Sequence, residues 1–467
     1  MSTTTQTHLL AYPFPSSGHA IPLIDLTKTL VSRGLYVTVL VTPTTLPLLP
    51  PDYSPLLQTL LLPAVKFTHP TQNRLIAVVK FMTHHHYPII LDWARAHSSP
   101  PTAIISDFFM AWTHHLARDL HVPRLVFSPS GAFALSISFS LWRDLQQNDN
   151  PEDENYVVSF PNVPNSPLYP WWQISPLFRE NKRGEPEWEY HRENMLLNLE
   201  AWGVVFNTFI GLERVYLDHV RKEIGHERVW AVGPVLPLPR GGSGSIGFED
   251  RGGSSTVDCH ELITWLDSHA DASVVYVCFG SRTVLTSAQM EVLTRALELS
   301  GVHFVLSLRG PDERHVARDN GKLPDGFVDR VRDEGFVIQG WAPQLVILNH
   351  RAVGSFLTHC GWNSVLEGLV SGVVMLTWPM GADQYTNAKL LVDQLGVAIR
   401  AAEGEENIPE ASELALRIKK SLEKTNERLR AEEIRGAAVN ALRKNGSSQK
   451  QLDTLVDKLN ELKTVHK

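Results

Sequence analysis

The chain has 467 residues, of which 43% are hydrophobic and 20% charged, and its formal net charge is −7. This length suits two α/β domains of roughly 200 residues each rather than a single core. Charges of both signs are interspersed, which argues against a nucleic acid or an anionic membrane as the main partner. The three cysteines, Cys259, Cys278 and Cys360, include no close pair, so a disulfide framework is excluded and a reducing compartment is expected.

The N-terminal segment, residues 1–15, lacks the basic stretch and the long apolar run of a signal peptide. No apolar run in the sequence reaches the length that spans a membrane. We therefore expect a cytoplasmic protein without membrane insertion, and we expect it to be a monomer.

One arrangement of elements occurs twice along the chain. A predicted strand at 8–14 is followed by a Gly/Ser turn, an amphipathic helix that ends at Gly34, and a β-branched strand at 35–41. The same plan recurs with a strand at 273–279, a helix and a strand at 302–308. Continuous apolar strands that alternate with helices indicate parallel sheets buried on both faces. The sequence therefore predicts two doubly wound α/β domains in tandem.

A segment rich in Pro, Gly and Ser separates the two predicted domains. We place an N-terminal domain at 1–240, a linker at 241–256, a second domain at 257–445, and a C-terminal helix at 446–467 that could pack back on the first domain. The linker contains a GxGxxG pattern at Gly242, Gly244 and Gly247. No strand precedes this pattern and no helix follows it, so we interpret it as linker and not as a dinucleotide site.

The run of three histidines at His84–His86 resembles a metal-binding sequence. Adjacent positions on a helix point in different directions, so three consecutive histidines do not converge on one ion. We interpret the run as an exposed helix surface.

The stretch Phe356–Ser364, "FLTHCGWNS", marks the end of a strand and the start of a helix. Its turn lies at the carboxyl edge of a parallel sheet, where ligands bind. The helix N-terminus offers free N–H groups, and Gly361 allows a ligand to approach the backbone closely. His359, Asn363 and Ser364 could add donors to a phosphate. No second Cys or His stands at metal-ligand spacing, so a phosphate is favoured over a metal.

Nearby residues suit the other parts of a nucleotide sugar. Glu367 lies one helical turn after Asn363 and could accept hydrogen bonds from ribose hydroxyls. Trp341 follows a strand and could stack on a base. Asp383 and Gln384 follow another strand, and a carboxylate beside an amide suits the hydroxyls of a sugar.

From Trp341 to Gln384 the sequence resembles, without a gap, the donor-binding signature of the plant family 1 UDP-sugar glycosyltransferases. The resemblance extends to both ends of the chain. It implies the GT-B architecture, in which two Rossmann-like, doubly wound parallel-sheet domains face each other across a cleft. Carried over position by position, it implies uracil stacking by Trp341, nucleoside contacts by Ala342 and Gln344, ribose binding by Glu367, diphosphate binding by Ser281, His359, Asn363 and Ser364, and contacts to the transferred sugar by Trp362, Asp383 and Gln384.

The catalytic base is expected in the first domain. His19 lies where the first turn becomes a helix, and the positive end of the helix dipole favours the neutral imidazole that a base must be. Asp107 ends another strand of the same domain and could orient the ring. Family members that the chain resembles use a His and an Asp at these positions, which makes His19 and Asp107 the expected catalytic pair.

The resemblance implies an inverting transfer from a UDP-sugar, a co-substrate, to a hydroxyl of a phenolic or flavonoid small molecule, with no cofactor and no metal. Gln384 favours UDP-glucose as the donor. The candidate acceptor contacts are Ser128, Ser130 and Trp172. Two alternatives remain open: a GT-B nucleotide-sugar epimerase or hydrolase, and a transferase that uses UDP-rhamnose or UDP-xylose.

Overall fold

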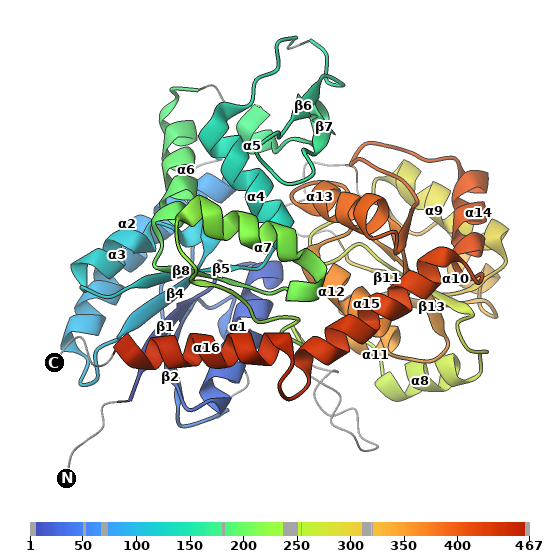
Figure 1. The fold of residues 1–467 in the computed structure, drawn as a ribbon. Coiled ribbons are helices and arrows are strands. Elements are labelled where there is room, and N and C mark those ends of the chain that lie inside the picture. The colour runs from blue at the N-terminus through green and yellow to red at the C-terminus, as the bar shows by residue number, and fades with distance from the viewer. Residues whose placement is uncertain are drawn as a thin grey trace. The chain divides into compact units, whose positions relative to one another are not determined.

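The computed structural model of the chain describes residues 6–49, 53–66, 73–150, 152–179, 183–236, 251–253, 255–310, 319 and 321–462. The chain divides into two units, and Figure 1 colours it by residue number. The first unit comprises Met1–Leu236 and Asn440–Lys467, and the second comprises Pro237–Val439. The GxGxxG glycines and most of the expected linker at 241–256 lie outside the described residues.

A seven-stranded parallel sheet forms the centre of the first unit, in the order β3-β2-β1-β4-β5-β8-β9. β1 pairs with β2 on one side and with β4 on the other, so that Ala11 lies opposite both Val39 and Ile105. The strand order reverses between β1 and β4, which is where doubly wound sheets bind ligands. The strands are β1 (His8–Tyr12), β2 (Tyr36–Val41), β3 (Leu57–Leu61), β4 (Ala103–Asp107), β5 (Arg124–Ser128), β8 (Gly203–Phe206) and β9 (Val229–Ala231).

Helices cover both faces of this sheet, because alternate side chains of a strand point to opposite faces. Leu9 and Ala11 of β1 face a core that α1 and α16 complete, whereas Leu10 and Tyr12 face a core that α2 and α3 complete. An antiparallel hairpin of β6 (Val157–Ser159) and β7 (Leu168–Pro170) is a separate feature of the same unit. The helices are α1 (Ser17–Ser32), α2 (Arg74–Ala96), α3 (Thr113–Asp119), α4 (Ala132–Ser140), α5 (Pro176–Arg179), α6 (Pro186–Leu196), α7 (Ile210–Ile224) and α16 (Ser447–Glu461).

The C-terminal helix α16, drawn in red in Figure 1, belongs to the first unit. Its Leu452 and Leu455 are buried in the same core as β1 and α1. The second unit ends at Val439, a few residues before the boundary at 445 that the sequence suggested. The boundary is hard to place from the sequence because α15 (Asn426–Leu442) continues through it without a break.

The histidine run lies on α2, and the expectation that it is an exposed surface is wrong for one residue. His84 and His85 are exposed, but His86 is fully buried. Its ring nitrogens lie 2.5 Å from the hydroxyl of Tyr12 and 2.9 Å from the carbonyl oxygen of Pro63. Burial lowers the pKa of His86, so the ring is a neutral polar link between α2 and β1.

The second unit is built on a six-stranded parallel sheet in the order β12-β11-β10-β13-β14-β15. The strand order reverses between β10 and β13, where Cys278 lies opposite Thr358. Val275 and Val277 of β10 face a core formed with α9 and α14. The strands are β10 (Val274–Cys278), β11 (His303–Leu308), β12 (Gly335–Gln339), β13 (Val353–Thr358), β14 (Val374–Thr377) and β15 (Ala398–Arg400).

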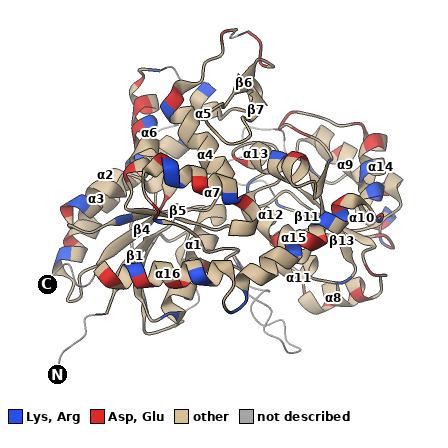
Figure 2. Cartoon of the chain, in the orientation of Figure 1, with Lys and Arg blue, Asp and Glu red and all other residues tan. Residues whose placement is uncertain are grey.

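The helices of this unit are α8 (Cys259–Asp267), α9 (Ser287–Ser300), α10 (Phe327–Arg330), α11 (Gln344–Leu348), α12 (Trp362–Ser371), α13 (Gln384–Lys389), α14 (Ala411–Ser421) and most of α15. Charges of both signs lie together on helices such as α3, α6, α14 and α15, whereas the strands carry few (Figure 2). Among the described residues no helix is long and apolar enough to span a membrane.

Candidate functional site

The switch point of the first unit brings His19 and Asp107 together. Asp107 is the last residue of β4, and His19 is in the first turn of α1, which follows β1. The Nδ1 atom of His19 lies 2.7 Å from Oδ2 of Asp107. The Asp107 side chain is fully buried, whereas the His19 side chain is 17% exposed. The carboxylate therefore holds the proton on Nδ1, which leaves Nε2 as an acceptor.

Neighbouring groups fix the orientation of this pair. The backbone N–H of Phe109 donates to Oδ1 of Asp107 at 2.9 Å, so each carboxylate oxygen has a defined partner. The Phe108 and Phe109 rings stack against the His19 imidazole, with centroid separations of 5.8 and 5.1 Å. Phe14 packs on the same imidazole at 5.4 Å. The ring is thus held by aromatic groups and by one carboxylate.

A buried cation beside Asp107 was missed by the sequence analysis. Arg124, on the neighbouring strand β5, donates to the hydroxyls of Ser106 and Thr113 at 2.9 Å and to the side-chain oxygen of Asn198 at 3.0 Å. Burial lowers the pKa of Arg124 to about 9, and the negative charge of Asp107 partly opposes that shift. Asn198 in turn donates to the carbonyl of Phe108. The network therefore contacts both sequence neighbours of Asp107, Ser106 and Phe108. Nothing in the local sequence around Arg124 signals this contact.

The candidate acceptor contacts are less well placed than the catalytic pair. Ser128 is fully buried and its hydroxyl donates to the carbonyl of Ser130 at 2.8 Å, so its hydrogen is used within the loop. Ser130 and Trp172 are partly exposed. Glu213, which the sequence analysis did not single out, accepts from the first two N–H groups of α4 at 3.0 and 2.9 Å. The loop before α4 is therefore anchored by a buried carboxylate whose pKa burial raises.

At the switch point of the second unit His359 is packed between two glycines. A Cβ atom added to Gly280 would lie 2.5 Å from Cε1 of the ring, and one added to Gly361 would lie 2.5 Å from Nε2. Both positions therefore require glycine. Burial lowers the pKa of His359 to about 4, and its Nδ1 atom has no hydrogen-bond partner among the described residues. His359 is thus neutral, and Ser281 follows Gly280 in the turn beside it.

The turn that contains His359 leads directly into α12. Cys360 has a positive φ of 65° and Gly361 is the N-terminal capping residue. Burial raises the pKa of the Cys360 thiol, so this cysteine is neither a thiolate ligand nor a nucleophile at neutral pH. Trp362, Asn363 and Ser364 form the first turn of α12, as a phosphate site at a helix N-terminus requires.

Gln344 connects the residues expected to bind the nucleoside. Its side-chain nitrogen donates to Oε2 of Glu367 at 2.7 Å and to the hydroxyl of Ser364 at 3.0 Å. Its side-chain oxygen accepts from the hydroxyl of Tyr276 at 3.2 Å, and its backbone N–H donates to the carbonyl of Ala342. Gln344, the first residue of α11, thus links side chains of β10 and α12 and the turn that follows β12.

The aromatic ring and the carboxylate of the expected nucleoside site both have cationic neighbours. The Arg309 guanidinium lies 4.7 Å from the centroid of the Trp341 ring. Arg251, from the segment before α8, forms an ion pair with Oε1 of Glu367. Neither arginine was found from the sequence.

Asp383 and Gln384 lie at the start of α13, next to the His359 turn. Asn387 of the same helix donates to the carbonyl of Cys360 at 2.9 Å, which joins α13 to that turn. The side-chain oxygen of Gln384 accepts from the N–H groups of Met380 and Gly381 at 2.9 and 3.2 Å. The expectation that the Gln384 amide both donates to and accepts from a sugar is therefore corrected: its oxygen serves the loop, and its NH₂ group remains as the donor.

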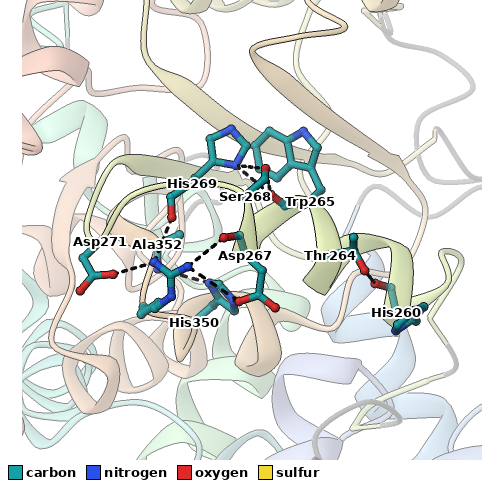
Figure 3. Close-up of polar contacts among 10 residues, drawn as sticks. His260, Thr264, Trp265, Asp267, Ser268, His269, Asp271, His350 and Ala352 are labelled. Atoms are coloured by element: carbon teal, nitrogen blue, oxygen red, sulfur yellow. Dashed lines mark hydrogen bonds and ion pairs between the residues drawn. The ribbon is translucent and has the colours of Figure 1, made fainter.

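A second polar cluster in this unit contains several histidines and aspartates but is a structural contact (Figure 3). His350 Nε2 lies 3.3 Å from Asp267, and Arg351 donates to Asp271 at 2.7 Å and to the carbonyl of His269 at 2.9 Å. A guanidinium thus joins the turn after α8 to the start of β13. Across the part of the chain that the structure describes, no three His, Cys, Asp or Glu side chains are grouped so that they could hold a metal ion.

Comparisons with known proteins identify the family to which the chain belongs. A family model described as UDP-glucoronosyl and UDP-glucosyl transferase matches residues 255–413. The chain is 46% identical to UDP-glycosyltransferase 89B2 of Stevia rebaudiana, and the match covers 97% of each protein. It is 45% identical to flavonol 3-O-glucosyltransferase UGT89B1 of Arabidopsis thaliana, over 97% of this chain and 96% of that protein.

A solved structure has the same fold. The crystal structure of Arabidopsis thaliana UGT89C1 complexed with UDP-L-rhamnose superposes with a TM-score of 0.78 at 32% identity, over 98% of this chain and all of that chain. The two parallel-sheet units are therefore those of the GT-B fold. The chain belongs to the plant family of UDP-glycosyltransferases, enzymes for which a UDP-sugar is a co-substrate.

Proposed function

We propose that this enzyme is an inverting O-glycosyltransferase that moves glucose from UDP-glucose to a hydroxyl of a phenolic or flavonoid molecule. The observation that carries the proposal is the contact between His19 and the buried Asp107 at 2.7 Å. Such a pair suits the removal of a proton from an acceptor hydroxyl, because the carboxylate stabilises the imidazolium that forms. A protein that only bound UDP-sugars would not need the pair of His19 and Asp107.

In the proposed reaction Nε2 of His19 takes the proton of the acceptor hydroxyl. The acceptor oxygen attacks the anomeric carbon of the sugar and forms the new bond on the face opposite the leaving group. The bond from that carbon to the β-phosphate oxygen breaks, and its electron pair leaves with UDP. An α-linked donor therefore gives a β-glucoside.

The second unit is proposed to hold the donor. Uracil would stack on Trp341, the ribose hydroxyls would donate to Glu367, and the diphosphate would meet the N-terminus of α12 with Ser281, His359, Asn363 and Ser364. The lowered pKa of His359 supports a neutral ring that donates one N–H to a phosphate oxygen. Trp362, Asp383 and the NH₂ group of Gln384 would contact the sugar.

The proposed acceptor and sugar are supported by the names of relatives and by one side chain of this protein, Gln384. One relative is named as a flavonol 3-O-glucosyltransferase, which supports a flavonoid acceptor and glucose. The structure solved with UDP-L-rhamnose keeps UDP-rhamnose as an alternative donor. We favour UDP-glucose because Gln384 can donate to the equatorial hydroxyls of glucose.

Incubation with UDP-glucose, with and without a flavonol, tests the proposal. We expect UDP release only when the flavonol is present, together with a glucoside that mass spectrometry detects. UDP release without the flavonol would instead indicate a hydrolase, and a new UDP-sugar without UDP release would indicate an epimerase.

We also propose that no metal takes part, so activity should survive prolonged EDTA treatment. Loss of activity that magnesium restores would contradict this.

A further inference from the structure

The carboxylate proposed to bind ribose already has a partner within the chain. Arg251 pairs with Oε1 of Glu367, while Gln344 donates to Oε2. The two side chains of the ion pair are 10% and 4% exposed, so water competes little for either charge. Arg251 and Glu367 are 116 positions apart in the sequence, and both belong to the second unit.

A buried carboxylate without a counter-charge is costly, and removing one member of a buried ion pair destabilises the other strongly. Gln344 supplies one neutral donor, which does not balance the charge of Glu367. Arg251 supplies the missing positive charge, which the neutral hydroxyls of a ribose do not supply. The pair therefore favours the form of the enzyme without a nucleotide.

The same segment also lies against the ring proposed to stack on uracil. A Cβ atom added to Gly253 would be 3.6 Å from Cδ2 of Trp341, which is van der Waals contact. The N–H of Thr256 donates to the carbonyl of Trp341 at 3.0 Å. Arg251 thus pairs with the carboxylate proposed to hold the ribose, and Gly253 lies beside the ring proposed to hold the base.

We propose that Arg251 is an internal competitor of the donor: the nucleotide sugar must displace its guanidinium from Glu367 to bind. This inference rests on the proposed function, since it takes Trp341 and Glu367 as the nucleoside site. Arg251 then determines donor affinity without contacting the reacting atoms. If the paired form makes up nine-tenths of the free enzyme, the apparent affinity for a nucleoside falls by about tenfold, because only the open tenth binds.

A second role for Arg251 has to be distinguished from this one. A guanidinium near the site could instead pair with the diphosphate and strengthen donor binding. Uridine separates the two roles, because it retains the base and the ribose but has no phosphate. A competitor lowers the affinity for uridine and for UDP alike, whereas a phosphate ligand acts on UDP alone.

The experiment measures UDP binding by isothermal titration calorimetry, and uridine binding by competition with UDP, for the wild type, Arg251→Ala and Arg251→Gln. We expect both variants to bind uridine and UDP more tightly, by about tenfold for Arg251→Ala, and Arg251→Lys to resemble the wild type. Arg332→Ala is the matched control, since Arg332 forms an exposed ion pair with Asp329 at 2.8 Å in the same unit. It should change neither affinity.

Any result in which the uridine affinity of Arg251→Ala and Arg251→Gln does not increase overturns the proposal. Weaker UDP binding with unchanged uridine binding would assign Arg251 to the diphosphate instead. A wild type that binds no UDP would contradict the proposed function itself, which is a different outcome. Circular dichroism of each variant checks that the fold is retained.

Discussion

The two units place a histidine after a strand at the same point of their sheets, where the strand order reverses, but they surround the two rings differently. His19 in the first unit has a buried carboxylate at 2.7 Å and remains partly exposed. His359 in the second unit lies between Gly280 and Gly361, and burial lowers its pKa to about 4. The first ring is equipped to accept a proton and the second is kept neutral.

This difference shows that the topology decides where a ligand site forms, while the neighbours of each side chain decide its chemistry. A carboxylate beside an imidazole stabilises the charged form that arises during proton transfer. Burial without a carboxylate disfavours the charged form and leaves a hydrogen-bond donor. The first unit is thus suited to the base and the second to the nucleotide.

The largest expected effect comes from removing the first ring. His19→Ala should reduce kcat by roughly 100-fold or more on a phenolic acceptor, because the proposed general base is lost. Initial rates at saturating UDP-glucose measure this. Asp107→Asn is the companion variant, since it keeps the shape but loses the charge, and it should reduce kcat less. Near-normal turnover by His19→Ala would show that His19 is not the base.

The lowered pKa of His359 should make the free energy of unfolding depend on pH. As the pH falls from about 6.5 to about 4, the unfolded chain binds a proton at His359 before the folded protein does, so the free energy of unfolding decreases. Between pH 7.5 and pH 5 the loss from this residue is on the order of 2 kcal/mol. Urea unfolding at both pH values should show a smaller loss for His359→Gln than for the wild type.

His84→Gln provides the control for that measurement, because His84 is exposed on α2. It should lose as much stability as the wild type on acidification. His8 and His191, whose pKa values burial also lowers to about 4, contribute to the loss in every protein compared. Equal losses in the wild type and His359→Gln would show that the second ring accepts a proton as readily as an exposed one.

A smaller effect is expected at Gln384, which tests how the second unit contacts the sugar. Gln384→Ala should lower kcat/KM for UDP-glucose by about tenfold with one acceptor held fixed, because one donor to the sugar is lost. Gln384→Glu keeps an oxygen for the N–H groups of Met380 and Gly381, but it replaces the NH₂ donor with a second, negatively charged oxygen. It should therefore show at least the same loss.

A donor panel of UDP-glucose, UDP-galactose, UDP-xylose and UDP-rhamnose completes the test at Gln384. We expect UDP-glucose to have the highest kcat/KM in the wild type. If Gln384→Glu behaves like the wild type while Gln384→Ala is impaired, the residue acts on the loop and the sugar is recognised elsewhere.

Much of the fold and part of the site could be predicted from the sequence. Apolar strands, helix-ending glycines and the turn before Trp362 are local patterns, so the two parallel sheets and the edges that carry His19 and His359 follow from them. The pairing of His19 with Asp107 joins positions 88 apart, and it came from the family resemblance. Local patterns alone do not identify such a pair.

The contacts that the sequence did not reveal are also long-range. Arg124, Glu213 and Arg251 each find their partners only after the sheets are assembled, and an arginine or glutamate in a sequence is ordinarily a surface residue. Gln384 illustrates a subtler limit. Its position was predictable, but the use of its oxygen by the loop depends on backbone geometry that composition does not specify.

If the proton chemistry belongs to the first unit and the nucleotide to the second, variants of the two units should differ in their affinity for UDP. Isothermal titration of UDP into the wild type, His19→Ala and Trp341→Ala measures this difference. We expect His19→Ala to bind UDP within about twofold of the wild type, since a base does not contact the nucleotide. We expect Trp341→Ala to bind UDP at least about tenfold more weakly, because one base stack is lost. An equal loss of UDP affinity in both variants, or an unchanged UDP affinity of Trp341→Ala, would contradict the assignment of the base to the first unit and of the nucleotide to the second.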